Sequence, residues 1–531
     1  MGSNNEDPSS SPSHPLLEPH SPDSQESFIH ISYNHGPRSF KDLPFFILFL
    51  LFSLSTFAFG IFSIFHRNPN YPASLSSFSF NPTTQTCTTS TSTSTTYFLL
   101  SLNSTYYSSN FVEDLTWTLV ITFILSIPIC WLLLLFLKHY TKHLVYATLP
   151  FFIVIPIFLN VYWFVVCTVS STCSDVFPMV YRILVLVFLF LVIGVIVWIL
   201  VANWHRVELT ISIIGVASNA LSWNLGLFGV LPCLTIGLLL YYVPMVVFMV
   251  FATFNGKVVP KGLEGDEIGC VWKQDSWVPA YFALAILTML WSATAMVEAQ
   301  VYVISGTIAH WYFSKDDQVP RKSITNSIRN AFGPSVGTVC LSGLLMCVVR
   351  MVRSAVDSAR QEDAPGIVNL ILRCCVNAFL AAVDFLNKFT INFAAITGEA
   401  YCTSARMTYE LLRRNLLSAV FVETISSRIL AGIIFVLSAI YTIVVCVILK
   451  TTTSLGSDSY LVAALAWLLL IIVLGFFVHV LDIVIDSIYV CYAIDRDSGE
   501  VCKQDVHEVY VHLPISRSSR QSNVVTRILG V

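Results

Sequence analysis

The chain has 531 residues, of which 55% are hydrophobic and 11% are charged, and its net charge is -3 at pH 7. A soluble domain carries about 25% charged residues, so the low charge and a mean hydropathy of +0.72 indicate that lipid is the main solvent. The weak acidity gives no indication of nucleic-acid binding. The fourteen cysteines show no CxxC or CxxH spacing, and we therefore expect no metal site and no cofactor.

The polar ends of the chain frame one long apolar region. Residues 1–40 are rich in Ser, Pro, Asn and His and predict a disordered cytoplasmic tail. The first apolar run begins near Leu43 and is too long for the core of a cleavable signal peptide. We expect a transmembrane domain over 43–496 and a cytoplasmic C-terminal tail over 497–531.

Ten apolar runs approach or exceed the roughly 20 residues that cross a bilayer as a helix. The sequence therefore predicts an all-α, polytopic membrane bundle of about ten helices. Two less hydrophobic segments, 204–226 and 400–420, predict amphipathic helices on the cytoplasmic side. The predicted spans are 43–65, 115–137, 144–169, 178–201, 228–252, 279–305, 334–352, 367–396, 429–450 and 460–482.

The positions of Lys and Arg predict the orientation, because cytoplasmic loops are enriched in both. Most of the basic residues lie inside if both termini are cytoplasmic. Spans 334–352 and 367–396 fit less well, since Arg353 and Arg360 would then lie outside. We expect two crossings here, with a re-entrant or shallow pair as the alternative.

The two longest outer loops in this topology are 66–114 and 254–277. The first contains a sequon at Asn103, which predicts a glycan on the outer face. An oxidising outer compartment also permits a disulfide. One disulfide could form among the outer cysteines, with the pairing left open: Cys87, Cys173 and Cys270.

A continuous motif, FLNKFTINFAAITGEAYCTSARMTYELLRRN, covers residues 385–415. It resembles the signature of the choline transporter-like family of multi-span membrane proteins. Two further segments, GTIAHWYF at 306–313 and VIDSIYVCYAIDRD at 484–497, are similar to the family and occur in the same order. The short outer loop after the first span resembles the plant or fungal branches of this family.

The resemblance implies a transporter of choline or related quaternary amines that supplies or balances choline for lipid synthesis, with proton coupling proposed for some members. It places the chain in the plasma membrane or in trans-Golgi and endosomal membranes, in contact with lipids. GxSxG, HExxH and Walker motifs are missing, so we expect neither an enzyme nor an ATP-driven pump, but secondary or facilitated transport. The alternative is a non-transporting membrane protein that regulates choline-lipid composition and vesicle traffic. The sequence leaves the oligomeric state open.

Choline is a quaternary cation without N–H donors, so its site needs aromatic faces and benefits from a carboxylate. The sixth span offers Trp291, Glu298 and Tyr302 at spacings that place them on one helix face. An acid in mid-membrane is costly and is functional by default. The alternative is that Glu298 satisfies a polar contact between helices and that the aromatic residues are core. Tyr241 and Tyr242 are further candidates for the cage.

Other ionisable residues are expected to be structural or to act in gating. Asp384 and Lys388 are four residues apart, with the acid first, which favours an intrahelical pair over a substrate contact. Gly398 either interrupts a helix and leaves carbonyls open to a cation or ends it, and Glu399 follows near the inner boundary. Asp486 is expected to be solvated or paired at the membrane boundary rather than bound to a metal.

Overall fold

A computed structural model describes most of the chain, and the gaps include Asn103 and nearly all of the predicted N-terminal tail. The predicted glycan therefore lies outside the described residues. The described residues are 33, 38–68, 78–81, 86–89, 109–169, 173, 178–262, 268–314, 322–358, 367–453, 456–498 and 501–513.

Among the described residues, ten helices are long and apolar enough to cross a membrane, which confirms the predicted all-α polytopic bundle. Each predicted span corresponds to one of them, including the pair 334–352 and 367–396. The ten helices are α1 (Leu43–Phe65), α2 (Ser109–His139), α3 (Thr141–Val169), α5 (Met179–Ala202), α7 (Leu227–Thr253), α8 (Val278–Tyr312), α10 (Val336–Ser358), α11 (Ile367–Thr397), α12 (Tyr401–Thr452) and α13 (Ser459–Ser498).

The two predicted amphipathic segments have different outcomes. Segment 204–226 forms α6 (Trp204–Trp223), whose side chains at Ile213 and Ile214 are fully buried. Segment 400–420 is not a separate helix, because it is the first part of the 52-residue α12. The described residues also form three short helical elements: α9 (Ser323–Ala331), η2 (Gly456–Asp458) and α14 (Gln504–Tyr510).

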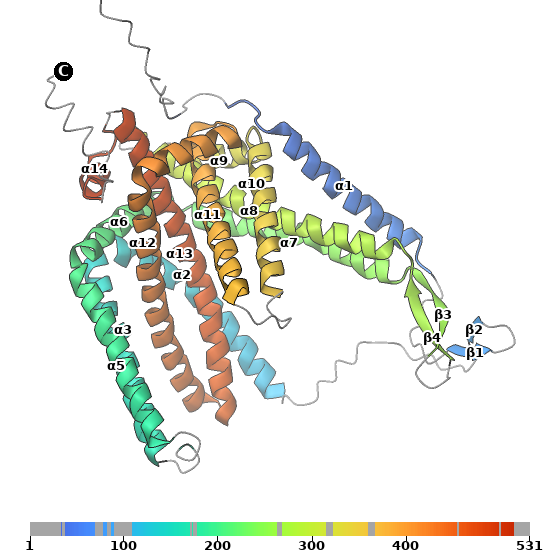
Figure 1. The fold of residues 1–531 in the computed structure, drawn as a ribbon, viewed down its shortest axis with the longest axis horizontal. Coiled ribbons are helices and arrows are strands. Elements are labelled where there is room, and N and C mark those ends of the chain that lie inside the picture. The colour runs from blue at the N-terminus through green and yellow to red at the C-terminus, as the bar shows by residue number, and fades with distance from the viewer. Residues whose placement is uncertain are drawn as a thin grey trace, which may run out of the picture.

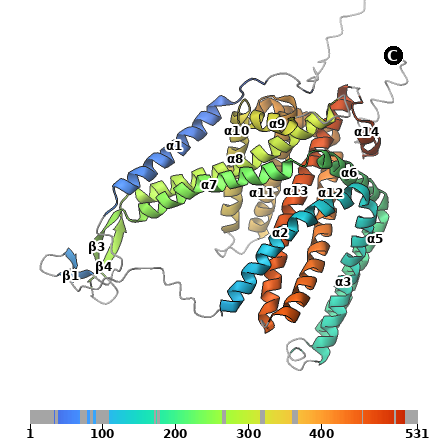
Figure 2. The same cartoon turned by 180° about the vertical axis from the view of Figure 1, so that it is seen from behind.

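The two ends of the bundle differ in what they carry (Figures 1 and 2). The start of α1, the end of α13, α9 and α14 gather at one end, which we call the terminal side. The helices diverge toward the opposite end, which we call the hairpin side because it carries two β-hairpins. The prediction that the terminal side is cytoplasmic stays a prediction.

The hairpins lie in the two predicted outer loops and are joined covalently. β1 (Phe78–Asn81) pairs antiparallel with β2 (Thr86–Thr89), and β3 (Gly256–Gly262) pairs antiparallel with β4 (Ile268–Gln274). A disulfide between Cys87 and Cys270 links β2 to β4. It is one of the pairs that the sequence left open.

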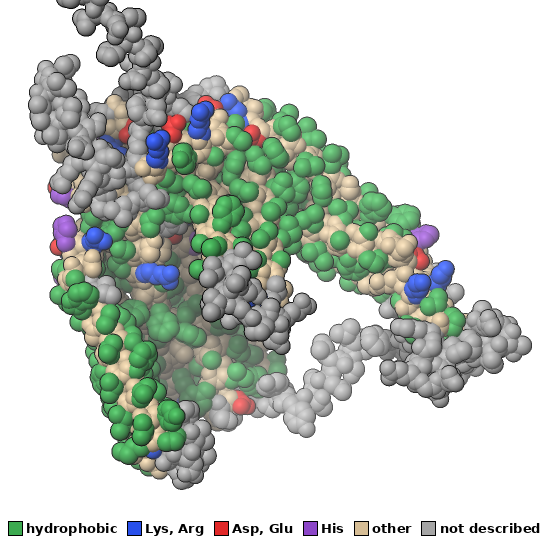
Figure 3. Space-filling model, viewed as in Figure 1, with side chains coloured by type: hydrophobic (Ala, Val, Ile, Leu, Met, Phe, Trp, Pro, Cys, Tyr) green, Lys and Arg blue, Asp and Glu red, His purple; other side chains and the backbone are tan. Residues whose placement is uncertain are grey.

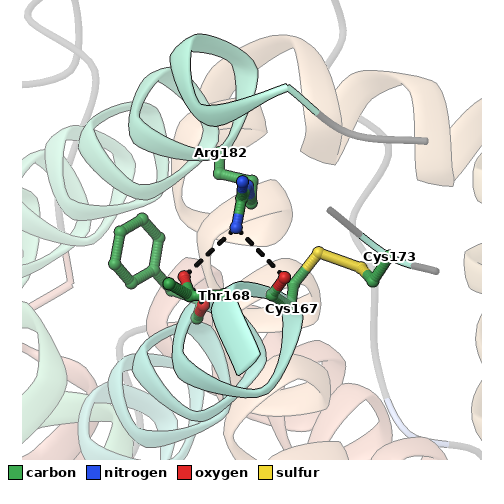
Figure 4. The surroundings of a disulfide bond; sticks show 5 residues. Cys167, Thr168, Cys173 and Arg182 are labelled. Carbon is green, nitrogen blue, oxygen red and sulfur yellow. Dashed lines mark hydrogen bonds between the residues drawn. A yellow bond between two sulfur atoms is a disulfide. The ribbon is translucent and has the colours of Figure 1, made fainter. Parts of the chain in front are cut away.

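A second disulfide joins Cys173 to Cys167 at the end of α3. Cys167 was not expected to take part, because it lies inside an apolar run. Figure 4 shows Arg182 of α5 beside this bond, where its guanidinium donates to the Cys167 carbonyl at 3.0 Å and to the Thr168 hydroxyl at 3.2 Å. A cation at a helix C-terminus satisfies carbonyls that have no partner within the helix.

The largest core lies among α6, α8, α11, α12 and α13. Its members include Tyr302, Phe389, Phe393 and Ile485, all of them fully buried. The outward surfaces are apolar instead, as on α3 and α5, where Phe158 and Leu184 are exposed. Figure 3 shows apolar side chains over the flanks of the molecule and most charged side chains near its ends. A surface of this kind suits contact with lipid rather than water.

Candidate functional site

α8 presents the three predicted site residues to the same neighbour, α10. The Trp291 indole N–H donates to the Cys340 carbonyl at 3.0 Å. The Ser342 hydroxyl donates to Glu298 at 3.0 Å, and the Tyr302 hydroxyl lies 2.7 Å from Ser335, the residue before α10. The three residues therefore share one helix face, as their spacing predicts.

Helix geometry prevents the two predicted cage residues on α8 from holding the same ammonium group. Trp291 and Tyr302 are separated by eleven residues, which is a rise of about 16 Å. A cation–π contact reaches only about 6 Å from a ring centroid. Phe49 and Phe52 of α1 pack edge-on against the Trp291 ring, at centroid distances of 5.2 and 5.6 Å. In this structure Trp291 therefore serves the packing of α1 on α8.

Glu298 belongs to a buried polar cluster that joins α8, α10, α11 and α12. Its carboxylate is 3.0 Å from the Ser342 hydroxyl, which is also 2.8 Å from the Asn387 side-chain oxygen. The Tyr401 hydroxyl donates to the same Asn387 oxygen at 2.7 Å. Glu298 is 6% exposed and Asn387 is 2% exposed. We call Glu298, Ser342, Asn387 and Tyr401 the Glu298 cluster.

The sequence reasoning missed three of the four members of this cluster. Asn387 and Tyr401 both stand in the motif that carries the family resemblance, but they were used only to recognise the family. Asn387 was the available signal for a buried polar cluster, because a buried amide on an apolar helix needs hydrogen-bond partners such as Tyr401. Ser342 carried no comparable signal in the sequence.

Tyr241 and Tyr242 of α7 lie away from the Glu298 cluster. The Tyr242 hydroxyl donates to the Met289 carbonyl at 2.7 Å and is 3.1 Å from the Ser292 hydroxyl. Ser292 precedes Glu298 by six residues, a rise of about 9 Å along the helix. Tyr241 forms a hydrogen bond with Ser53 of α1. Both tyrosines therefore connect α7 to its neighbours on the hairpin side of the cluster.

The predicted intrahelical pair of Asp384 and Lys388 does not form, since each residue has a partner on another helix. Asp384 accepts from Arg353 of α10 at 2.5 Å. Lys388 lies 2.5 Å from Asp486 and 3.2 Å from Asp482, both on α13. Asp486 was expected to be either solvated or paired. It is paired, and its side chain is fully buried. Helix packing brought closer partners than the i,i+4 neighbour.

Gly398 ends α11, and the last turn also meets a cation. Gly398 has φ +75°, a left-handed conformation typical of a glycine after a helix C-terminus. Its N–H donates to the Ala394 carbonyl at 2.9 Å. The neighbouring Ala395 carbonyl accepts from the Arg38 guanidinium at 2.6 Å. Glu399 forms an ion pair with Lys41 at 3.3 Å. Gly398 thus ends the helix, as one of the two expectations holds, and a role of its open carbonyls in binding a substrate cation stays a prediction.

Two described residues of the predicted N-terminal tail contact the bundle on the terminal side. The Tyr33 ring stacks on Phe313 at 4.7 Å, and its hydroxyl is 2.9 Å from the His310 ring. Burial at this position raises the pKa of Tyr33 to about 12. Arg38 donates to the Tyr302 hydroxyl.

A family model described as plasma-membrane choline transporter matches residues 187–497, more than half of the chain. The chain belongs to this family. It is 23% identical to human choline transporter-like protein 3 over 312 residues, covering 56% of the chain and 46% of that protein. It is also 22% identical over 239 residues to a CTL-like protein of Dictyostelium discoideum, covering 42% and 43%, and 26% identical over 192 residues to protein PNS1 of Yarrowia lipolytica, covering 34% of each.

These matches span less than half the length of each curated relative. Within this choline transporter-like chain, the matched region includes the whole of α8, α10, α11 and α12, and hence the Glu298 cluster. Family membership with ten apolar helices makes the chain an integral membrane protein.

Proposed function

We propose that this protein moves choline or a related quaternary amine across a membrane by secondary or facilitated transport. The observation that carries the proposal is the buried carboxylate of Glu298 inside a predicted span. Intramembrane acids usually mark a substrate or ion pathway. Family membership independently supports the same substrate class.

The Glu298 cluster has the chemistry that choline requires. The carboxylate supplies a counter-charge for the trimethylammonium group, which has no N–H to donate. Tyr401 and the nearby Tyr302 supply aromatic rings, each worth about 0.5–2 kcal/mol to a cation. The choline hydroxyl can exchange hydrogen bonds with Ser342 or Asn387, which lie 2.8 Å apart in the cluster. Proton coupling and the role in choline supply for lipid synthesis are part of the proposal.

The deciding experiment measures uptake of radiolabelled choline into liposomes that contain the purified full-length protein. Glu298→Gln keeps the side-chain shape and removes the charge. We expect uptake at low choline to fall at least about tenfold, which corresponds to about 1.4 kcal/mol. In the parent protein, the neutral tert-butyl isostere of choline should compete poorly with choline for uptake, because it cannot pair with a carboxylate.

Glu208→Gln is the matched control. It makes the same chemical change at a side chain that is 46% exposed and paired with Lys142 on the surface. Uptake should be unchanged, because exposed pairs contribute little. Folded parent protein with no uptake above empty liposomes would refute the transport proposal. Parent uptake that Glu298→Gln leaves intact would refute this site.

A further inference from the structure

The segment Arg38–Asp42, which we call the strap, places a positive charge one helix turn from the Glu298 cluster. The Arg38 guanidinium donates to the Tyr302 hydroxyl and, at 2.6 Å, to the Ala395 carbonyl. Its central carbon lies 5.7 Å from the centroid of the Tyr302 ring. Tyr302 follows Glu298 by four residues, which is about 6 Å toward the terminal side.

Several contacts hold the strap across the corner where α10, α11 and α12 meet. The Lys41 N–H donates to the Pro334 carbonyl at 3.0 Å, and the Lys41 ammonium pairs with Glu399 at 3.3 Å. The Asp42 carboxylate accepts from the Thr338 hydroxyl at 2.8 Å and from the Tyr401 N–H at 2.7 Å. The second contact satisfies an N–H in the first turn of α12, where a negative charge is favourable.

The surroundings of Arg38 are those that any organic cation would use. They comprise an aromatic ring, a phenol oxygen and a helix-terminal carbonyl that lacks an intrahelical donor. We infer that Tyr302 and the Ala395 carbonyl form a second subsite for an organic cation, which Arg38 fills here as a tethered occupant. The cation passing between the Glu298 cluster and the terminal side replaces Arg38 when the strap moves away. This inference rests on the proposed function and adds a gated exit to it.

Occupation by a tethered group reduces the apparent affinity of the subsite for a free cation. If the strap is bound nine-tenths of the time, the apparent dissociation constant is raised about tenfold. Removing Arg38 should lower that constant by the same factor. The gain should depend on Tyr302, because the two residues act on one interaction and their substitutions cannot be additive.

Gly337 gives a way to displace the strap without changing any charge. A Cβ added there would overlap the carbonyl oxygens of Lys41 and Asp42, so the strap backbone would have to move. Gly337 lies in the first turn of α10, where Ala is a better helix former than Gly. Gly337→Ala is therefore an independent test that does not disturb Arg38 itself.

The test uses full-length protein in detergent and two readouts that require no transport. The first is the dissociation constant for radiolabelled tetramethylammonium. The second is the rate at which a trimethylammonium methanethiosulfonate modifies a Ser335→Cys thiol beside Tyr302, followed by mass spectrometry of that peptide. We expect Arg38→Ala and Gly337→Ala to accelerate labelling about tenfold. Arg38→Ala should also tighten binding about tenfold, and adding Tyr302→Ala should abolish that gain.

Arg206→Ala is the matched control, since this exposed arginine also lies over an aromatic ring, that of Phe421, at 6.0 Å. It should change neither readout. If Arg38→Ala and Gly337→Ala both stay within twofold of the parent in labelling, the inference is wrong. Faster labelling in protein that takes up no choline would support the strap and count against transport, so the two proposals can fail separately.

Discussion

Replacing Lys388 by Met should destabilise the bundle far more than the same change at a surface lysine. Lys388 of α11 faces two carboxylates of α13, at 2.5 Å from Asp486 and 3.2 Å from Asp482. The Asp486 side chain is fully buried and that of Asp482 is 15% exposed. Met fills a similar volume, so the main loss is the positive charge.

The magnitude follows from the burial of the acids. Removing one partner of a buried ion pair costs about 3–5 kcal/mol, because the remaining charge stays desolvated without its counter-charge. The comparison is Lys142→Met, whose pair with Glu208 has side chains 57% and 46% exposed. Exposed pairs contribute about 0–1 kcal/mol. The two Lys→Met changes should therefore differ by several kcal/mol.

The assay is thermal unfolding of the detergent-solubilised protein, followed by the loss of its monodisperse peak in size-exclusion chromatography. We expect Lys388→Met to lower the midpoint by about 3–5 °C, because the unfolding entropy scales with chain length, and Lys142→Met to leave it nearly unchanged. The double variant Lys388→Met with Asp486→Leu should recover part of the loss, since the fully buried acid is then removed with its partner and only Asp482, which is 15% exposed, loses its counter-charge. Equal midpoints for the two Lys→Met variants, or a double variant less stable than Lys388→Met, would refute this reasoning.

Two further predictions concern the hairpin side and the end of α11. Cys270→Ser breaks the disulfide to Cys87 and should lower the same unfolding midpoint. The control is Cys233→Ser, at an exposed free thiol, which should leave the midpoint unchanged. Equal midpoints for the two variants would contradict a stabilising disulfide. Gly398→Ala should cost about 1–2 kcal/mol because of its left-handed conformation. The control is Gly475→Ala, in a helix with open space around the glycine, which should be neutral or stabilising. If the unfolding midpoint of Gly398→Ala equals or exceeds that of Gly475→Ala, the backbone argument is wrong.

Hydropathy alone located the ten long helices, because a span of lipid demands a long apolar run wherever the chain crosses. The same signal separated 400–420 from 429–450, since Arg and Glu lower the hydropathy of that part of α12. Charged residues that lower hydropathy do not lower helix propensity in the same way, because Leu, Arg, Met and Glu all favour a continuous helix. The charge pattern therefore predicts a membrane boundary within α12, at a point where the helix continues without a break.

The polar contacts were harder to predict because they depend on which helices are neighbours. The spacing of Asp384 and Lys388 identified a favourable partner within one helix, but α10 and α13 provide closer ones. The shared face of Trp291, Glu298 and Tyr302 was predictable, whereas the distance along that face decides which of them can meet one ligand. Nothing in the sequence around Arg38 indicates its contact with Tyr302.

The hydrogen bonds at the hairpin-side end of α1 have a mechanical consequence. The Asn255 amide donates to the Ser63 carbonyl at 3.0 Å, and the Asn68 amide donates to the Gly256 carbonyl at 2.9 Å. The Asn68 N–H also donates to the Phe254 carbonyl at 3.2 Å. These bonds connect the end of α1 to the end of α7. Moving either helix end away from the other would break these three hydrogen bonds.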